Sequence, residues 1–413
     1  MTRLAERAEP RRPAWQTLAR ILLVFVLLYG FLGGMAMMGE GLKALGKNPH
    51  FDASQPQADG NQPYRPVVYQ VFSHAANPLV GLFVGILVTA IFQSSSFTAA
   101  FVVSLVVTTP LTLHQAIFII MGVNIGTCIT NAGVSFMQMR RAEEFERAYG
   151  AAITHEIFNT LTVLILFPIE WIVWKATGRG FLERIASALA SGFYSGTPTG
   201  HKPTNFLKEA VEPLTSGTSW ILDRGLGLSH NWANVALAAL GVVLLFVALI
   251  GVTKALRNLV LKRVERLFDR VLFRNDLTAF LVGLVLTGTV QCSSITTSLV
   301  VPLVAAGLLN IFQVFLFTLG ANVGTTVTAL LASFAASADT PQLAKVGIAL
   351  AFSHTAFNVL GVAVWYPLRR VPIGIARWHA RQAARSKRYA VFHVVGFFFG
   401  LPLLILSLCW LLE

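Results

Sequence analysis

The chain has 413 residues, of which 55% are hydrophobic and only 12% are charged, and its formal net charge is +13. Soluble domains carry roughly 25% charged residues, so this composition excludes a soluble multi-domain protein of the same length. We therefore expect an all-α integral membrane protein. The three cysteines (Cys128, Cys292 and Cys409) lie in apolar runs and indicate no disulfide framework. In a membrane protein, excess basic residues report orientation, so we expect no nucleic-acid partner.

Nine apolar stretches follow an arginine-rich N-terminus. Residues 1–20 contain five Arg and lack a small-residue cleavage site after a short apolar region, so we do not expect a cleaved signal peptide. Most of the stretches exceed the roughly 20 residues that an α-helix needs to span a bilayer. They lie at about 18–46, 79–107, 114–136, 150–174, 232–252, 278–307, 312–335, 344–367 and 391–412.

The chain contains an internal duplication. Aligning residues 85–136 with 283–334 without a gap gives 19 identities in 52 positions. Self-similarity of this kind is typical of repeated structural units. The duplicated motifs are Gln-Ser-Ser-Ser at 93–96 with Gln-Cys-Ser-Ser at 291–294, Gly-x-Asn-x-Gly-Thr-x-x-Thr at 122–130 and 320–328, and His-x-x-x-Asn at 155–159 and 354–358.

Charge predicts how the two repeats face. If the two stretches that contain the Gln-Ser motifs are re-entrant hairpins and the N-terminus is cytoplasmic, 22 of the 32 Lys and Arg residues fall in cytoplasmic stretches. If all nine stretches cross, only 18 do, so the hairpin topology obeys the positive-inside rule better. In the hairpin topology, an odd number of membrane crossings also separates each segment of repeat 1 from the equivalent segment of repeat 2. The repeats are therefore inverted, with broken segments near the midplane, as in secondary transporters.

This topology divides the chain into six parts. We expect an N-terminal cytoplasmic tail, first transmembrane helix and external loop (1–78), repeat 1 (79–175), an external insert (176–231), a transmembrane helix with a basic cytoplasmic loop (232–277), repeat 2 (278–367), and a second basic loop with the last transmembrane helix (368–413).

The hairpin motifs predict an ion site. Unwound backbone inside a membrane costs several kcal/mol per unpaired polar group unless it is buried in protein or lines a watery cavity. Amide and hydroxyl oxygens suit Na⁺, and the same hydroxyls, with N–H groups at helix N-termini, can donate to an anion. The alternative is that small polar residues serve only close helix packing.

The segments around the motifs lack basic residues. No Lys or Arg occurs in residues 79–136 or 278–335, so a bound anion needs neutral donors, helix ends and cations. This favours Na⁺-coupled anion entry.

Glu156 is an acid inside a predicted membrane segment. Because an ionisable side chain is costly there, we expect Glu156 to have a functional role. His155 and His354 are not joined by an acid or Cys in a metal-binding pattern, so we expect no transition metal.

These residues resemble a known family. Residues 84–89 with 93–96 and 119–127, and residues 287–294 with 319–326 and 365–367, are similar to the two repeats of the type II sodium/phosphate cotransporters. The resemblance covers about residues 78–378 and implies sodium-driven symport of inorganic phosphate by alternating access. In the family, the two Gln-Ser motifs meet and form the phosphate and sodium sites. Cys292 departs from the family, where a Ser is usual.

The resemblance and the motifs together predict the binding residues. We expect phosphate to bind at Gln93, Ser94, Ser95, Ser96, Ser293, Ser294, Asn124 and Thr127, and Na⁺ at Gln291, Asn322, Thr325, Thr328, Gln93, Glu156 and Asn159.

The expected setting is a bacterial inner membrane, with a multi-pass chain and a cytoplasmic N-terminus. The expected partners are inorganic phosphate, Na⁺ and the lipid bilayer, with no cofactor beyond the coupling ion; a homo-oligomer is compatible with the sequence. Symport of sulfate or arsenate, an ion channel with re-entrant filter loops, and a membrane serine hydrolase with Ser95 as nucleophile are the alternatives. We expect a transporter and no enzymatic activity.

Overall fold

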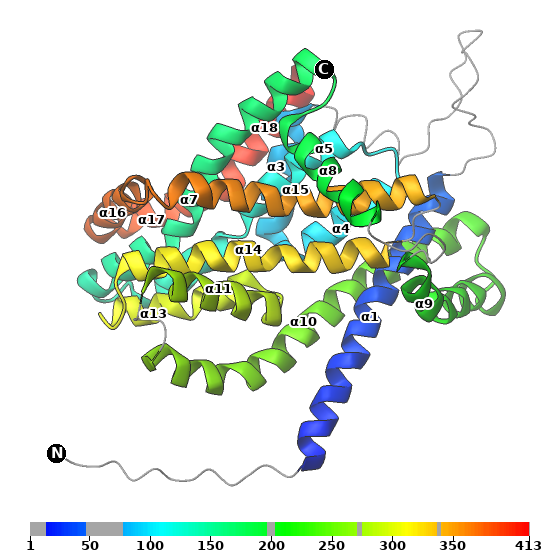
Figure 1. Ribbon diagram of the computed structural model, residues 1–413, viewed down its shortest axis with the longest axis horizontal. Coiled ribbons are helices and arrows are strands. Elements are labelled where there is room, and N and C mark those ends of the chain that lie inside the picture. Colours follow the sequence, from blue (N-terminus) through cyan, green and yellow to red (C-terminus); the bar gives the residue numbers. More distant parts are fainter. Residues whose placement is uncertain (1–13, 47–76, 196–202, 271–274, 337–339, 413) are drawn as a thin grey trace.

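The computed structural model describes residues 14–46, 77–195, 203–270, 275–336 and 340–412. All regular structure within these ranges is helical, as Figure 1 shows, which confirms the all-α prediction. Seven described helices are long and apolar enough to cross a membrane, and they coincide with the seven stretches predicted to cross. The two predicted hairpins contain shorter apolar helices. The start of the predicted tail and most of the external loop lie outside the described residues.

The two halves of the chain repeat one order of helices. The first half contains α1 (Ala14–Gly46), α3 (Pro78–Phe92), α4 (Ser95–Thr108), α5 (Leu113–Gly126), α6 (Ile129–Ser135), α7 (Ala142–Thr177) and α8 (Phe181–Ser195). The second contains α10 (His230–Arg270), α11 (Asp276–Val290), α12 (Ser293–Ser298), α13 (Val300–Ala305), α14 (Ile311–Ala335), α15 (Pro341–Trp365) and α16 (Arg370–Arg385). Outside this order lie α9 (Pro203–Trp220), α17 (Lys387–Val395) and α18 (Leu401–Leu412).

The halves interlock through equivalent contacts. Within each half, the first hairpin helix packs against the helix that follows the hairpin: α3 against α5, and α11 against α14. Between the halves, α8 packs on α15, α16 packs on α7, and α1 packs along α10. Figure 1 shows α14 and α15 running side by side through the middle of the molecule. The duplication therefore builds one core rather than two separate domains.

Paired glycines bring the hairpin helices close to their neighbours. A Cβ on Gly122 would lie 3.0 Å from the Cα of Gly85 and 2.9 Å from the backbone nitrogen of Ile86, and it would collide with a backbone carbonyl oxygen. Gly320 and Gly283 stand at the equivalent positions and have equivalent collisions. Only glycine permits this approach of two helix backbones, which explains why these positions recur in both repeats.

Each hairpin turns at a glutamine. Gln93 (φ 52°) and Gln291 (φ 57°) are the non-glycine residues with positive φ in the described part of the chain. A left-handed conformation costs an L-residue about 1–2 kcal/mol. A glutamine in this conformation thus ends both α3 and α11. Gln93 donates its N–H to the carbonyl oxygen of Thr89, and Gln291 donates its N–H to that of Thr287.

The second helices of the hairpins differ. The Oγ of Ser94 accepts the N–H of Phe97 and caps α4, whereas Cys292 makes no side-chain cap on α12. Pro302 removes the backbone N–H that would bond to the carbonyl oxygen of Ser298, and its ring clashes with that carbonyl. Accordingly α12 ends at Ser298 and α13 begins at Val300, while α4 is unbroken.

Two stretches predicted as basic loops are largely helical. Helix α10 continues to Arg270, and α16 and α17 occupy most of residues 368–390. Helix α16 buries alanines on one side and exposes arginines on the other, since Ala376, Ala380 and Ala383 are buried while Arg377 and Arg381 are exposed. Charge count alone does not reveal such a helix, because it does not report on which side of the helix the basic residues lie.

We predict that Cys292→Ser stabilises the protein. A serine at this position can accept a backbone N–H of α12 as Ser94 does in α4, and an N-cap of this kind contributes about 1 kcal/mol. The free energy of unfolding, measured by denaturant titration in detergent, should rise by about that amount. The reverse change, Ser94→Cys, should lower it. Equal stability of both variants and the unmodified protein would contradict the capping argument.

Candidate functional site

The tips of the two hairpins meet. The Oγ atoms of Ser95 and Ser293, the first residues of α4 and α12, lie 3.4 Å apart. Ser96 Oγ donates to the backbone oxygen of Gln291 at 2.6 Å and lies 3.3 Å from Thr328 Oγ1. All four serine and threonine side chains are buried. The structure therefore brings together five residues that the sequence predicted to bind phosphate or Na⁺.

The equivalent contact on the other side is not made. By the repeat offset, Ser294 corresponds to Ser96 and Thr130 corresponds to Thr328. The Oγ of Ser294 and the Oγ1 of Thr130 are buried and have no hydrogen-bond partner among the described residues. The two halves thus have the same polar groups but different bonding, so the hairpin tips are arranged asymmetrically.

A second cluster joins the repeats through asparagines and histidines, and we call it the Asn–His network. His155 Nε2 lies 2.5 Å from Asn322 Oδ1, and His354 Nε2 lies 3.1 Å from Asn124 Oδ1. Each histidine therefore bonds to the asparagine of the opposite repeat. The remaining contacts are from Asn322 Nδ2 to Asn159 Oδ1 (2.9 Å), from Asn358 Nδ2 to Asn124 Oδ1 (3.2 Å) and from Asn159 Nδ2 to the backbone oxygen of Asn124 (3.0 Å).

Asn131 links this network to the second hairpin. Its Oδ1 accepts the hydroxyls of Thr297 and Ser298, each at 2.9 Å, and its Nδ2 lies 3.2 Å from His155 Nδ1. The sequence did not single out Asn131, because the equivalent position in repeat 2 is Ala329 and the duplication gives no signal there. On the opposite side His354 Nδ1 is buried without a described partner.

Other predicted residues take local roles. Thr127 Oγ1 donates to the carbonyl oxygen of Val123 and Thr325 Oγ1 to that of Ala321, so both hydroxyl protons are used within their own helices. Ser94 caps α4, and the Gln93 residue is exposed at the hairpin tip. The oxygen lone pairs of the two threonines remain available to a cation.

Glu156 is placed beside the C-terminal helices. Its Oε1 lies 3.1 Å from His393 Nε2 on α17, and the other ring nitrogen of His393 lies 2.7 Å from the hydroxyl of Tyr149. Within the described residues, its carboxylate forms no hydrogen bond or ion pair with either hairpin tip.

His379, outside the crossing helices, has its pKa lowered to about 4, first by burial and then by the charge of His393.

The arrangement disfavours two of the alternatives. A serine nucleophile needs a base within hydrogen-bond reach, but the partner of Ser95 Oγ is Ser293, and His155 and His354 bond to asparagines. A pore through the hairpin tips would expose their hydroxyls, whereas Ser95 is 4% exposed and Ser293 is 2% exposed. The contacts fit a closed binding site better than a hydrolase or a channel.

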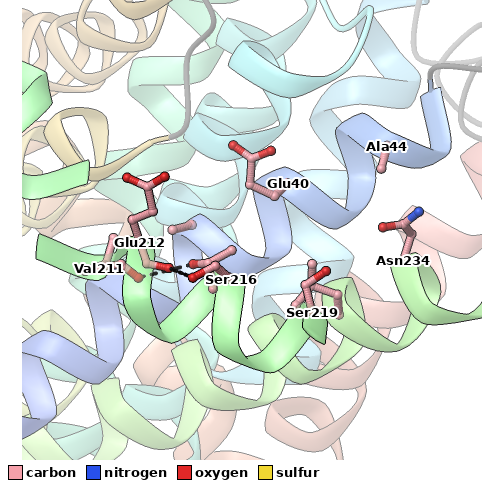
Figure 2. Close-up of a pocket in the computed structure, with 10 residues that line it drawn as sticks. Glu40, Ala44, Val211, Glu212, Ser216, Ser219 and Asn234 are labelled. Carbon is pink, nitrogen blue, oxygen red and sulfur yellow. Dashed lines mark hydrogen bonds between the residues drawn. The ribbon is translucent and has the colours of Figure 1, made fainter. Parts of the chain in front are cut away.

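A cavity of about 330 Å³ lies away from these motifs, between α1, α9 and α10. Figure 2 shows Glu40 of α1 and Glu212 of α9 at this cavity, with Ser216 Oγ donating to the backbone oxygen of Glu212 at 2.8 Å. It contains no residue of the duplicated motifs. The residues predicted to bind phosphate or Na⁺ therefore do not line this cavity.

We predict that His393→Ala destabilises the protein through Glu156. The change leaves a buried carboxylate without its partner, and breaking a buried pair in this way costs about 3–5 kcal/mol. Thermal unfolding in detergent measures the loss. Combining it with Glu156→Gln, which removes the charge, should recover much of the stability. A double variant as unstable as the sum of the two single changes would show that the residues do not act as a pair.

The chain is similar to known transporters. The sequence model of the Na⁺/Pi-cotransporter family matches residues 67–186 and 244–366. The sodium-dependent phosphate transport protein 2B of Homo sapiens is 28% identical over 483 residues, covering 95% of this chain and 66% of that protein. The 2A protein of Rattus norvegicus is 30% identical over 399 residues, covering 81% and 61%. The 2A protein of Ovis aries is 28% identical over 465 residues, covering 96% and 69%.

This chain therefore spans about two thirds of the length of these relatives. No solved structure matches it significantly. The two blocks of the family match contain the two hairpin tips and both halves of the Asn–His network. Because these blocks cover more than half of its residues, the chain belongs to the Na⁺/Pi-cotransporter family.

Proposed function

We propose that the protein imports inorganic phosphate across the plasma membrane of a bacterium, driven by Na⁺. The observation that carries the proposal is the contact between Ser95 and Ser293, which joins the tips of the two hairpins at a buried, polar place. The relatives' names supply the substrates, since they are sodium-dependent phosphate transport proteins. In this proposal the chain is not an enzyme.

The phosphate site would lie at the hairpin tips. Serine hydroxyls and backbone N–H groups at the starts of α4 and α12 are donors suited to phosphate oxygens. Of the predicted phosphate ligands, Asn124 belongs to the adjoining Asn–His network. Thr127 is the C-cap residue of α5, the helix that contains Asn124. Residues 79–136 and 278–335 contain no Lys, Arg, Asp or Glu. The donors are therefore neutral, and binding of the anion depends on Na⁺ nearby.

The Na⁺ ions would bind to neutral oxygens around the same centre. The predicted ligands Gln291 and Thr328 both contact Ser96, and Asn322 and Asn159 bond to each other. Thr325, one turn from Asn322, lies on the same helix. Glu156 stays a predicted Na⁺ ligand, although its observed partner is His393. The other carboxylate oxygen, Oε2, is buried without a hydrogen-bond partner among the described residues and would be the atom that binds the ion.

Asymmetry between the halves supports alternating access. Ser96 is bonded to Gln291 and Thr328, while the equivalent groups Ser294 and Thr130 lack described partners. Inverted repeats can exchange conformations, so that a second state forms the Ser294 contacts and loses the Ser96 contacts. The site would then open first to one side of the membrane and then to the other.

The cytoplasmic N-terminus rests on charge. Of the 32 Lys and Arg residues, 22 fall on the side of the N-terminus in the proposed topology. If each of the seven described helices that are long and apolar enough crosses the membrane, helices α1 and α18 begin and end on opposite sides of it in this proposal. Cysteine labelling at Ser386, an exposed cap between α16 and α17, would test the side on which that segment lies.

We predict that proteoliposomes take up radiolabelled phosphate only with an inward Na⁺ gradient. Choline or K⁺ in place of Na⁺ should abolish uptake, because the neutral site then lacks compensating charge. Uptake that is equal in Na⁺ and choline would overturn the proposal. If sulfate or arsenate were accumulated under the same gradient and phosphate were not, the protein would be a symporter of another oxyanion.

We predict that Ser95→Ala and Ser293→Ala each raise the KM for phosphate roughly 10- to 100-fold, since a hydrogen bond to a charged group contributes about 1.5–3 kcal/mol. Ser191→Ala is the matched control, because Ser191 is exposed and its hydroxyl donates to the carbonyl oxygen of Ser187 within α8. Its KM should not change. Unaltered phosphate KM in both hairpin variants would show that the hairpin tips do not bind the anion.

A further inference from the structure

A group of possible metal ligands lies at one end of the first half, away from the hairpin tips. His114 is in the first turn of α5, Glu170 is near the end of α7, and Glu183 is in the first turn of α8. One ligand atom from each residue can be chosen so that all lie within 4.8 Å of one another. Figure 1 shows α8 beside α5, and α8 also packs against α7.

The side chain of His114 is buried and forms no hydrogen bond with the described residues. The residue is 8% exposed, and both of its ring nitrogens lack a hydrogen-bond partner among the described residues. Its ring stacks on Trp174 with centroids 4.3 Å apart and meets Phe118 edge-on at 5.0 Å. Buried polar groups are normally hydrogen-bonded. Packing thus holds in place an imidazole whose nitrogens form no hydrogen bond within the described part of the chain, with Nδ1 4.0 Å from Glu170 Oε1.

The two carboxylates are held by the backbone at the start of α8. Glu170 is fully buried, and its Oε2 accepts the N–H of Leu182 while its Oε1 accepts the N–H of Glu183 at 3.4 Å. Glu183 Oε2 accepts the N–H of Gly180 at 3.2 Å. Any side chain at Gly180 would collide with the Glu170 carboxylate. Each oxygen keeps a second lone pair, so the carboxylates are positioned and can still bind a cation.

We propose that His114, Glu170 and Glu183 bind a divalent transition-metal ion of the Zn²⁺ type. Imidazole nitrogens and carboxylate oxygens are both zinc ligands, and three protein ligands leave the fourth position of a tetrahedral site for water. Ligand atoms about 2.0–2.2 Å from zinc lie roughly 3.4 Å apart, so the side chains need to close by about an ångström. Na⁺, Ca²⁺ and Mg²⁺ prefer oxygen ligands throughout, which the imidazole does not offer.

Charge balance agrees with a divalent ion. Two carboxylates and a neutral imidazole neutralise Zn²⁺ in a largely buried place. Two positive groups oppose the ion: the N-terminus of α8, and Arg179, whose Nε lies 3.5 Å from Glu183 Oε1. The Arg179 side chain is 57% exposed, so water screens it and it can turn away. The ion would tie α8, which packs on α15 of the other half, to α5 and α7.

The duplicated histidines, His155 and His354, indicate no transition-metal site, and the sequence pattern gives no signal for a site elsewhere. His114 is not duplicated, since Phe312 stands at the equivalent position. Its two acidic partners lie 56 and 69 residues further along the chain, on two other helices. Only the packing of α5, α7 and α8 brings the three side chains together, so the ligand set has no short motif.

The test is Zn²⁺ titration of the full-length protein, purified without a histidine tag and stripped with chelator. Calorimetry should show one saturable site per chain, and Zn²⁺ should raise the melting temperature. A large excess of Na⁺ should not displace the ion. Co²⁺ in place of Zn²⁺ should give the visible absorption of a four-coordinate site. Absence of a stoichiometric site in the unmodified protein would overturn the proposal.

Two variants locate the site. His114→Gln should weaken Zn²⁺ binding at least about tenfold and abolish the Co²⁺ spectrum, whereas His230→Gln, which changes an exposed histidine in α10, should leave both unchanged. Glu183→Gln changes a half-buried residue and provides a second test if His114→Gln does not fold. Binding that is unchanged in Glu183→Gln, or lost equally in His230→Gln, would contradict the assignment.

Discussion

An asparagine buried in an apolar helix bundle must find hydrogen-bond partners, and this requirement holds the two halves of the protein together. Asn124 and Asn322 are 6% and 4% exposed. Each obtains a histidine from the opposite repeat: His354 for Asn124 and His155 for Asn322. Leaving such a group unpaired costs about 1–3 kcal/mol. Separating the halves would break several of these contacts at once, so the hairpin tips rest on a common core.

The hairpins attached to this core are less constrained. Their glutamine turns are alike, but only the first hairpin has a side-chain cap and an unbroken second helix. Pro302 divides the second into α12 and α13, and Asn131 bonds to the α12 residues Thr297 and Ser298. The same duplicated motif is therefore held by different contacts in each half. Two repeats that carry equivalent motifs but are held by different contacts can adopt two conformations that differ in only a few of those contacts.

Duplication made much of the fold predictable. The Gln-Ser motifs located both hairpin tips, and apolar length with charge located the seven crossing helices. Residues that occur once gave no such signal. Asn131, His114 and His393 lie beside side chains of distant helices, and a periodic or repeated pattern cannot report a contact made by one copy alone. Helix α16 was also hidden, because three of its buried residues are alanines that alternate with basic residues.

Electrostatics explains why a neutral site suits coupled transport. A helix N-terminus carries roughly half a positive charge, so the two that meet near Ser95 and Ser293 supply about one. Phosphate groups carry about one and a half to two negative charges near neutral pH. If phosphate bound there, the helices alone would leave about half to one negative charge uncompensated in a buried place, and burying an unpaired charge is strongly unfavourable. A fixed lysine or arginine would remove that deficit permanently and hold the anion with or without Na⁺. With neutral oxygens, only a mobile cation would compensate the remaining negative charge. Binding of the anion and of Na⁺ would then be favourable only when both are present.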